Sequence, residues 1–498
     1  MIKKIEKKYK MVVFCFILAL VSLLICSESS PLYPLNDWFD ANIYFTVGKG
    51  MVNGFVPYLD LFDHKGPIIY LIYGIGSLIS SSSFIGVFIL EVISFTIFLY
   101  YIYKIIVVFC KEKFSYIILP VFTCLIVTST AFVQGSSVEE FAFPLLSCGL
   151  YYLIEYYKKQ ELSRIVYFVQ GLFAGIILVL KFNLLGFWFG FMFFILIDLC
   201  LQKKFKDAIF NSLIFLSGMI LPFAFFSIYF LINGAFDEFI YTYFGLNLFG
   251  YANEDISLIQ MLKTGLVNFI DSLLNNSLIL FILFIGVFVF ILNSSLKRRY
   301  KIMLSLTIII MILGIFGGGR VYNYYLLFLL PLIIFSLIGI AKYYKKVIDR
   351  GFNSKFKIIL LVVFYISILL LTLYGANFRQ NVFKPKSEMI QYKLANIINK
   401  EEDKSILNFG LDLGVYFATD TIPNVKYYFL TNFDPNVFSD NLNSQKEYIM
   451  KGKTNFIVTI SNNAFDDEIN KKYKLIYQEQ VVIEDFPYDV KLYKRVSK

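Results

Sequence analysis

The segment DWFDANIYFTVGKGMVNGFVPYLDLFDHKGP, from Asp37 to Pro67, follows one long apolar run and precedes many others. It contains four aspartates, two lysines and the single histidine of the chain. Charged side chains that lie close to hydrocarbon lose part of their hydration, which is costly. A loop that keeps so many of them between apolar runs therefore indicates a functional site.

The composition of the whole chain is that of a membrane protein. Of the 498 residues, 58% are hydrophobic and 16% are charged, whereas soluble domains are about half apolar and a quarter charged. The net charge of +10 would also suit a nucleic-acid binder. The lysines and arginines gather beside alternate apolar runs, however, which is a signal of membrane topology. We therefore expect membrane lipids, and no nucleic acid, as partners.

The chain is predicted to cross the membrane about eleven times. The first run, Met11–Cys26, follows a basic stretch and lacks a clear cleavage site, so it is interpreted as an uncleaved helix with the N-terminus inside. Gly66–Ser80 is short and broken by glycine, which favours a juxtamembrane or re-entrant helix on the outer side. The other predicted spans are 83–109, 115–132, 141–157, 165–181, 182–201, 208–232, 277–295, 302–318, 325–343 and 358–377.

The distribution of positive charge predicts the orientation and the domains. Lysine and arginine are frequent in the loops assigned to the inside and rare in those assigned to the outside. An odd number of spans then places residues 378–498 outside the cell membrane. This segment combines a helix-like stretch with strand-like stretches such as TNFIVTIS, so we expect a soluble extracytoplasmic α/β domain. Residues 1–377 would form the membrane domain, with a catalytic outer loop at 29–66.

Five residues of the first outer loop are candidates for a site. Asp37 and Asp40 lie close to the membrane surface, where reduced hydration strengthens a carboxylate as a general base. Asp63, His64 and Lys65 precede a Gly-Pro pair that can begin a helix. The free N–H groups of a helix start, with a lysine beside them, favour an anionic group such as phosphate. The alternative for Lys65 is contact with lipid headgroups.

A second outer loop and a polar interruption supply further candidates. Glu139 and Glu140 lie in QGSSVEEFAFP between two apolar runs. Lys181 and Asn183 separate two adjacent runs at an outer turn. They form either a third polar site or the cap of a tight hairpin.

The segment GGGRVYNYY contains the other prominent outer cation, Arg320. A guanidinium group suits bidentate binding of phosphate. Tyr322 follows closely and could support it, or it could belong to an aromatic belt at the membrane interface. Glu91 lies inside an apolar run and is left without an assignment.

These motifs resemble those of the GT-C glycosyltransferases. The first loop, with its extension to DHKGPIIYLIY, is similar to that of bacterial relatives of the dolichyl-phosphate-mannose protein mannosyltransferases and of the aminoarabinose lipid A transferase. QGSSVEEFAFP resembles their second acidic loop, and GGGRVYNYYLLFLLP resembles a later outer motif. The chain departs from the pattern in two places: Gly66 stands between the lysine and the proline, and Tyr324 occupies a position where histidine is common.

The resemblance implies a GT-C-like fold and an inverting transferase that uses a polyprenyl-phosphate sugar, such as an undecaprenyl-phosphate hexose. Asp40, or as a second choice Asp37, would be the catalytic base. Lys65 and Arg320 would bind the donor phosphate. Glu139 and Glu140 would orient the acceptor or a metal, and a requirement for divalent metal stays open.

Two other classes of function were weighed. A multispan transporter or flippase of a lipid-linked saccharide would be expected to show paired halves and charges near the bilayer midplane. No similarity between halves is visible, and the charges cluster at one face. A surface-binding protein with a membrane anchor would need far fewer spans. The acceptor of a transferase could be a cell-wall polymer, a glycolipid or a protein.

Overall fold

A computed structural model describes residues 2–250, 258–318, 322–343, 354–460, 466–483 and 486–496. The chain divides into two compact units. The first, called the helical unit here, comprises Met1–Ser30, Ile89–Phe225 and Asn253–Arg379. The second, called the sheet unit, comprises Pro31–Phe88, Phe226–Ala252 and Gln380–Lys498. The first-loop segment is thus grouped with the C-terminal residues, while the predicted domain division at residue 377 stays a prediction.

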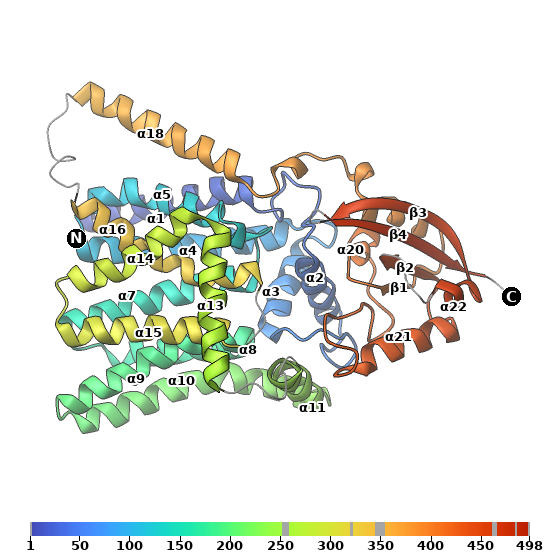
Figure 1. Cartoon of the computed structure of the whole chain (residues 1–498), viewed down its shortest axis with the longest axis horizontal. Helices are drawn as coiled ribbons and strands as arrows, with labels where there is room; N and C mark the ends of the chain where they lie inside the picture. The colour runs from blue at the N-terminus through green and yellow to red at the C-terminus, as the bar shows by residue number, and fades with distance from the viewer. Residues whose placement is uncertain are drawn as a thin grey trace. The chain divides into compact units, whose positions relative to one another are not determined.

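The helical unit is a bundle of apolar helices. The axes of most of these helices are roughly aligned, while α13 crosses them (Figure 1). Helices α4 and α10 continue into the sheet unit. The helices are α1 (Ile2–Cys26), α4 (Ile85–Phe109), α5 (Ser115–Val127), α6 (Val138–Phe141), α7 (Phe143–Lys159), α8 (Arg164–Lys181), α9 (Gly186–Leu201), α10 (Phe205–Ile232), α13 (Leu258–Asn276), α14 (Leu278–Asn293), α15 (Arg298–Phe316), α16 (Ile334–Tyr343) and α18 (Ser354–Gly375). Short 3-10 turns are η1 (Glu112–Phe114), η2 (Thr130–Phe132), η3 (Phe182–Leu185) and the longer η5 (Asn323–Ile333).

The chain is a multi-pass membrane protein. In the described part of the chain, seven helical stretches are long and apolar enough to cross a membrane. Large apolar side chains point outward along several of them, for example Leu213 and Ile228 of α10 and Leu370 of α18. A helix that is apolar on its outer faces suits a hydrocarbon environment. The number of about eleven spans and the orientation of the termini stay predictions.

The sheet unit contains a four-stranded sheet with short helices around it (Figure 1). The strands are β1 (Ile406–Phe409), β2 (Phe456–Ile460), β3 (Tyr473–Ile483) and β4 (Phe486–Arg495). Their order is β1-β2-β4-β3; β1 and β2 are parallel and the other two pairs are antiparallel. The helices from the C-terminal segment are η7 (Lys386–Glu388), α19 (Ile390–Ile398), α20 (Val415–Thr419), α21 (Ser439–Lys451) and α22 (Asp466–Asn470), after the turn η6 (Arg379–Asn381). The small C-terminal sheet domain is therefore confirmed.

Other segments of the sheet unit come from earlier in the chain. Helix α2 (Phe39–Val52) lies within the first loop, and α3 (Pro67–Ile79) follows the loop and begins at the predicted proline. Between the predicted spans 208–232 and 277–295, the sheet unit adds α11 (Phe236–Phe239), the π-helical turn η4 (Ile240–Gly245) and α12 (Leu246–Phe249). These short helices were not predicted, because each is too short to show a clear period.

Helices α2 and α3 lie side by side, and two glycines bring their backbones into contact. A Cβ atom on Gly48 would lie 2.5 Å from the carbonyl oxygen of Tyr70, and one on Gly74 would lie 2.7 Å from the carbonyl oxygen of Gly48. No other residue allows such an approach without displacing backbone. The close packing matters because the candidate site residues stand at the first turn of α2 and just before α3.

Candidate active site

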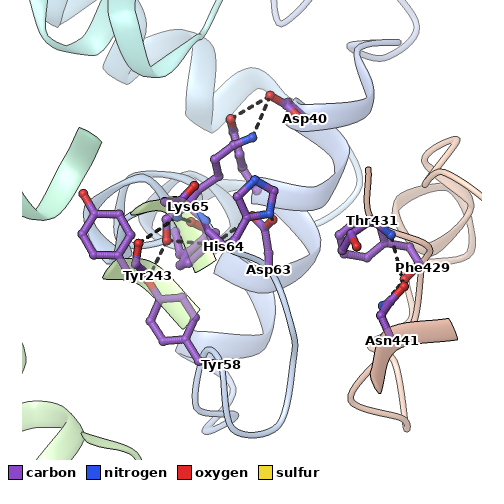
Figure 2. Close-up of polar contacts among 12 residues, drawn as sticks. Asp40, Tyr58, Asp63, His64, Lys65, Tyr243, Phe429, Thr431 and Asn441 are labelled. Atoms are coloured by element: carbon purple, nitrogen blue, oxygen red, sulfur yellow. Dashed lines mark hydrogen bonds and ion pairs between the residues drawn. The ribbon is translucent and has the colours of Figure 1, made fainter. Parts of the chain in front are cut away.

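The central pair of the candidate site is Asp40 and Lys65. Asp40 lies in the first turn of α2 and Lys65 lies two residues before α3. Lys65 Nζ is 3.2 Å from Asp40 Oδ2 (Figure 2). The Tyr44 hydroxyl, one turn along α2, donates to the same carboxylate oxygen at 3.1 Å. The side chains of Lys65 and Asp40 remain 18% and 21% exposed, so both can reach a ligand.

The backbone around Lys65 is fixed by two buried tyrosines. Tyr58 donates its hydroxyl to the Lys65 carbonyl at 2.6 Å, and the Lys65 N–H donates to the Tyr70 hydroxyl at 3.0 Å. Tyr58 has a φ of 70°, which is uncommon for a residue other than glycine and costs about 1–3 kcal/mol. Strain of this kind persists only where neighbouring contacts hold the chain in place. Here the hydrogen bonds of Tyr58 and Tyr70 hold the loop that carries Lys65.

Asp63 and His64 immediately precede Lys65 in the same loop, and both are buried (Figure 2). The Tyr70 hydroxyl donates to Asp63 Oδ2 at 2.8 Å, and His64 Nδ1 is 3.4 Å from Asp63 Oδ1. Burial raises the pKa of Asp63, and the positive charge of Lys65 partly offsets this. The Asn247 amide donates to the His64 carbonyl at 2.6 Å. These contacts suit residues that support the loop that carries Lys65.

Asp37, the second choice for the base, is engaged differently from Asp40. The Gln391 amide on α19 donates to Asp37 Oδ1 at 2.7 Å and to the Leu413 carbonyl at 3.1 Å. Asp37 therefore ties the start of α2 to the C-terminal segment, whereas Asp40 faces the lysine. The two aspartates therefore have different partners, and the choice between them as the base stays a prediction.

In the helical unit, Glu139 and Lys181 form a second buried ion pair. Lys181 Nζ lies 2.5 Å from Glu139 Oε1, and the Glu139 side chain is 1% exposed. The ammonium group also lies over the rings of Tyr325 and Tyr324, at 4.3 Å and 5.0 Å from their centroids. A cation over an aromatic face is stabilised by about 0.5–2 kcal/mol. Asn183 follows in the turn η3 between α8 and α9, and its predicted part in a polar site stays a prediction.

Glu140 belongs to a separate polar network that includes Glu91. The Ser136 backbone N–H donates to both carboxylates, at 2.7 Å to Glu140 and 3.0 Å to Glu91. The Ser27 hydroxyl donates to the other oxygen of Glu91 at 2.8 Å. Burial and the adjacent charge of Glu91 raise the pKa of Glu140. Glu139 and Glu140 of VEEF thus have different partners, although a single role is predicted for the two from the sequence.

The later motif is only partly described. Arg320 lies outside the described residues, so its predicted contact with phosphate stays a prediction. Tyr322 stacks on Tyr324, with ring centroids 5.4 Å apart and planes 9° apart.

The candidate residues fall into two groups. The sheet unit holds Asp37, Asp40, Asp63, His64 and Lys65, and the helical unit holds Glu139, Glu140, Lys181, Asn183 and Tyr322.

A family model matches residues 2–379, which is most of the chain, and its description is "Putative competence-induced protein Ccs4 N-terminal domain". The chain belongs to this Ccs4 N-terminal family. The match covers the first loop, the second acidic loop and the later motif. It ends where the C-terminal sheet domain begins.

Comparison with solved structures shows the fold of this Ccs4-family chain. The crystal structure of ArnT from Cupriavidus metallidurans bound to undecaprenyl phosphate is similar with a TM-score of 0.56 and 11% identity, over 97% of each chain. The apo structure of the same ArnT gives a TM-score of 0.57 at 11% identity and the same coverage. No curated protein matches the chain. The predicted GT-C-like fold is therefore confirmed.

A metal site in the Ccs4-family chain would need several His, Cys, Asp or Glu side chains close together. In the described ranges, no group of three or more His, Cys, Asp or Glu side chains is close enough to hold an ion. In the sheet unit, the partner of the Asp40 carboxylate is an ammonium group. The requirement for a metal stays open, and no step below depends on one.

Sequence reasoning missed residues that hold the site of the Ccs4-family chain in place. Tyr44 could have been found, because a residue four positions after Asp40 lies on the same face of a helix. Gln391 could not, because it is 354 positions from Asp37 and no local pattern connects them.

Asp412 is another residue that the sequence analysis missed. It follows β1, has no exposed surface, and accepts hydrogen bonds from the Gly414 N–H at 2.9 Å and the Asn408 amide at 3.0 Å. The Thr46 hydroxyl of α2 lies 3.4 Å from its other oxygen. Burial raises the pKa of Asp412 to about 6 from an ordinary 3.8, although the hydrogen bonds act in the opposite direction.

The wild-type protein is expected to lose stability as the pH rises from about 4 to about 6. Replacing Asp412 by asparagine is expected to abolish this loss. In this window the folded protein holds a proton that the unfolded chain releases. The free energy of unfolding therefore falls as the pH rises, by up to about 3 kcal/mol. Thermal unfolding of the solubilised full chain from pH 4 to pH 7 checks this. The exposed Asp467 supplies the control substitution, and equal pH dependence in Asp412→Asn and wild type would contradict the prediction.

Proposed function

We propose that this protein is an integral-membrane glycosyltransferase that moves a sugar from a polyprenyl-phosphate donor to an extracytoplasmic acceptor, with inversion. The observation that carries the proposal is the ion pair between Asp40 and Lys65 at 3.2 Å, at the start of two helices packed backbone to backbone. A carboxylate beside a phosphate-binding ammonium group supplies both charges that the reaction needs. The GT-C fold supports the proposal, because one of the similar ArnT structures holds undecaprenyl phosphate.

In the proposed reaction, Asp40 takes the proton of an acceptor hydroxyl. The acceptor oxygen forms a bond to the anomeric carbon as the bond between that carbon and the phosphate oxygen breaks. The electron pair leaves with the polyprenyl phosphate, which gains one negative charge. The ammonium group of Lys65 stabilises that charge, and Arg320 would add a second positive charge. Fixed charges aimed at a developing anion are usually the largest contribution to such a rate.

The present pairing of Asp40 with Lys65 also suits the resting state. In the absence of donor, the ammonium group is the counter-ion of the carboxylate. A donor phosphate near Lys65 would share that ammonium group with the carboxylate. The hydroxyl of Tyr44 keeps the carboxylate oriented during this exchange.

Replacing Lys65 by methionine is expected to lower transfer by about 10²–10³-fold, because methionine keeps the apolar stem and removes the charge that stabilises the leaving phosphate. The assay incubates membranes containing the full chain with radiolabelled undecaprenyl-phosphate sugars of several kinds. It follows the label as it leaves the lipid fraction for a cell-wall polymer, a glycolipid or a protein. The sugar that is transferred and the fraction that receives it identify donor and acceptor.

The control is Lys471→Met, which removes an exposed charge on the same unit. This variant should transfer at the wild-type rate. A wild-type protein that releases no sugar from any donor would refute the proposed function and would favour a transporter of a lipid-linked saccharide. A Lys65→Met variant as active as wild type would remove the phosphate-binding role of Lys65.

A further inference from the structure

Helix α2 has two faces with different surroundings. With about 100° of rotation per residue, Tyr44 lies about 40° from Asp40 around the helix axis. Asn42, Phe45, Thr46 and Lys49 lie about 140–240° from Asp40, on the opposite face. The face that carries Asp40 meets Lys65, and the opposite face meets the C-terminal segment.

The opposite face is held by one ion pair, one hydrogen bond and one ring contact. Lys49 Nζ lies 2.5 Å from Asp420 Oδ1, and the Lys49 side chain is only 10% exposed. The Thr46 hydroxyl donates to Asp412 at 3.4 Å. The ring of Phe45 meets that of Phe417 edge-on, with centroids 5.0 Å apart. All three partners lie within eight residues of one another, in and around α20.

The partners are themselves fixed by local structure. Asp420 ends α20 in the left-handed conformation, with a φ of 57°, which aspartate tolerates better than most residues. Asp412 is held by the N–H of Gly414 and the amide of Asn408. Gly414 approaches α2 closely, because a Cβ on it would lie 2.6 Å from Asn42 Oδ1. The residues of the C-terminal segment that meet α2 are therefore themselves held by local hydrogen bonds and close packing.

Rotation of α2 about its axis would move Asp40 directly. A side-chain atom about 6 Å from the axis moves about 2 Å when the helix turns by about 20°. A misplacement of about 1 Å can cost about 10²-fold in rate. Contacts on the face opposite to Asp40 are well placed to prevent such a rotation, and Gly48 against α3 limits translation.

We propose that Lys49, through its ion pair with Asp420, is a positioning residue for Asp40, so that the C-terminal domain sets the rotation of α2 in the active site. This inference rests on the proposed function. It gives the C-terminal domain a part in catalysis that acts through α2. Removal of the pair should lower kcat and leave the KM for the donor nearly unchanged, because Lys65 is held by Tyr58 and Tyr70 instead.

The test measures kcat and KM for the transferred donor in four full-chain proteins: Lys49→Met, Asp420→Asn, Lys49→Arg and the exchanged pair Lys49→Asp with Asp420→Lys. The first two should lose about 10–100-fold in kcat. Lys49→Arg and the exchanged pair should recover most of that loss. The control exchanges Lys494 and Glu401, an exposed ion pair at 2.7 Å on the same domain, and should leave both constants unchanged.

The outcomes separate the inference from the proposed function. An active wild type with full kcat in Lys49→Met and Asp420→Asn would overturn the positioning role alone. If kcat and the amount of folded protein fell equally, and the exchanged pair recovered neither, the ion pair would be merely structural. That result would also overturn the positioning role. A wild type inactive with every donor would refute the proposed function, and the inference would fail with it.

Discussion

Replacing Asp40 by asparagine is expected to lower sugar transfer by about 10²–10⁴-fold, which is the usual contribution of a general base. Asparagine has nearly the same shape and can still accept the hydroxyl of Tyr44, so the fold should be preserved. It cannot take the proton of the acceptor hydroxyl, and it loses the charge that pairs with Lys65. The rate of label transfer from the donor identified in wild type measures the effect.

Two further measurements make this result specific. Donor binding, followed by the shift in thermal unfolding on addition of the lipid-linked sugar, should persist in Asp40→Asn, because Lys65 remains. Asp37→Asn should lose much less activity, since its partner Gln391 can also hydrogen-bond to an amide oxygen. If Asp40→Asn transferred at the wild-type rate while Asp37→Asn did not, the base would be Asp37.

Replacing Lys181 by methionine is expected to destabilise the protein by about 3–5 kcal/mol. The substitution leaves the carboxylate of Glu139 almost fully buried without its counter-ion, and an uncompensated buried charge is strongly destabilising. The attraction between the ammonium group and the rings of Tyr324 and Tyr325 is lost as well. Thermal unfolding of the solubilised full chain measures the loss.

The double variant Lys181→Met with Glu139→Gln separates stability from function. It removes both charges, so most of the stability should return. If Glu139 orients the acceptor as predicted, the double variant should be stable and yet poorly active. A stable and fully active double variant would show that the pair is structural. The control is Lys159→Met. Lys159 is exposed and pairs with Glu155 on the same helix face, so this change should lower the free energy of unfolding by less than about 1 kcal/mol.

The parts of the site that could be predicted are those with short-range signals. Proline after glycine marks the start of α3, and a lysine just before that start suits an anion, so Lys65 could be chosen from the sequence. Asp37 and Asp40 could be singled out together because they stand in a charged loop between apolar runs, and the preference for Asp40 came from the family resemblance. The strands of the C-terminal domain were predicted because β-branched and aromatic residues cluster between turns.

The parts that could not be predicted depend on distant partners. Glu139 and Glu140 are adjacent in sequence, but successive residues of a helix point in different directions, so Glu139 meets Lys181 and Glu140 accepts from the Ser136 N–H. Nothing local distinguishes the two. Likewise, Asp37 and Asp40 look equivalent until Gln391 is placed beside the first of them. Such assignments require the tertiary structure, because burial and pairing are decided between segments rather than within them.

The ion pair between Lys49 and Asp420 has a consequence for biosynthesis. The two residues are 371 positions apart, and at about 5–20 residues per second a ribosome needs roughly 20–75 s to travel between them. Helix α2 is therefore made early and lacks this contact until residue 420 has emerged from the ribosome. The membrane helices that lie between the two residues in the sequence can be inserted during this interval. A chain not yet extended to Asp420 would thus already lie in the membrane without the contact that holds the Lys49 side of α2.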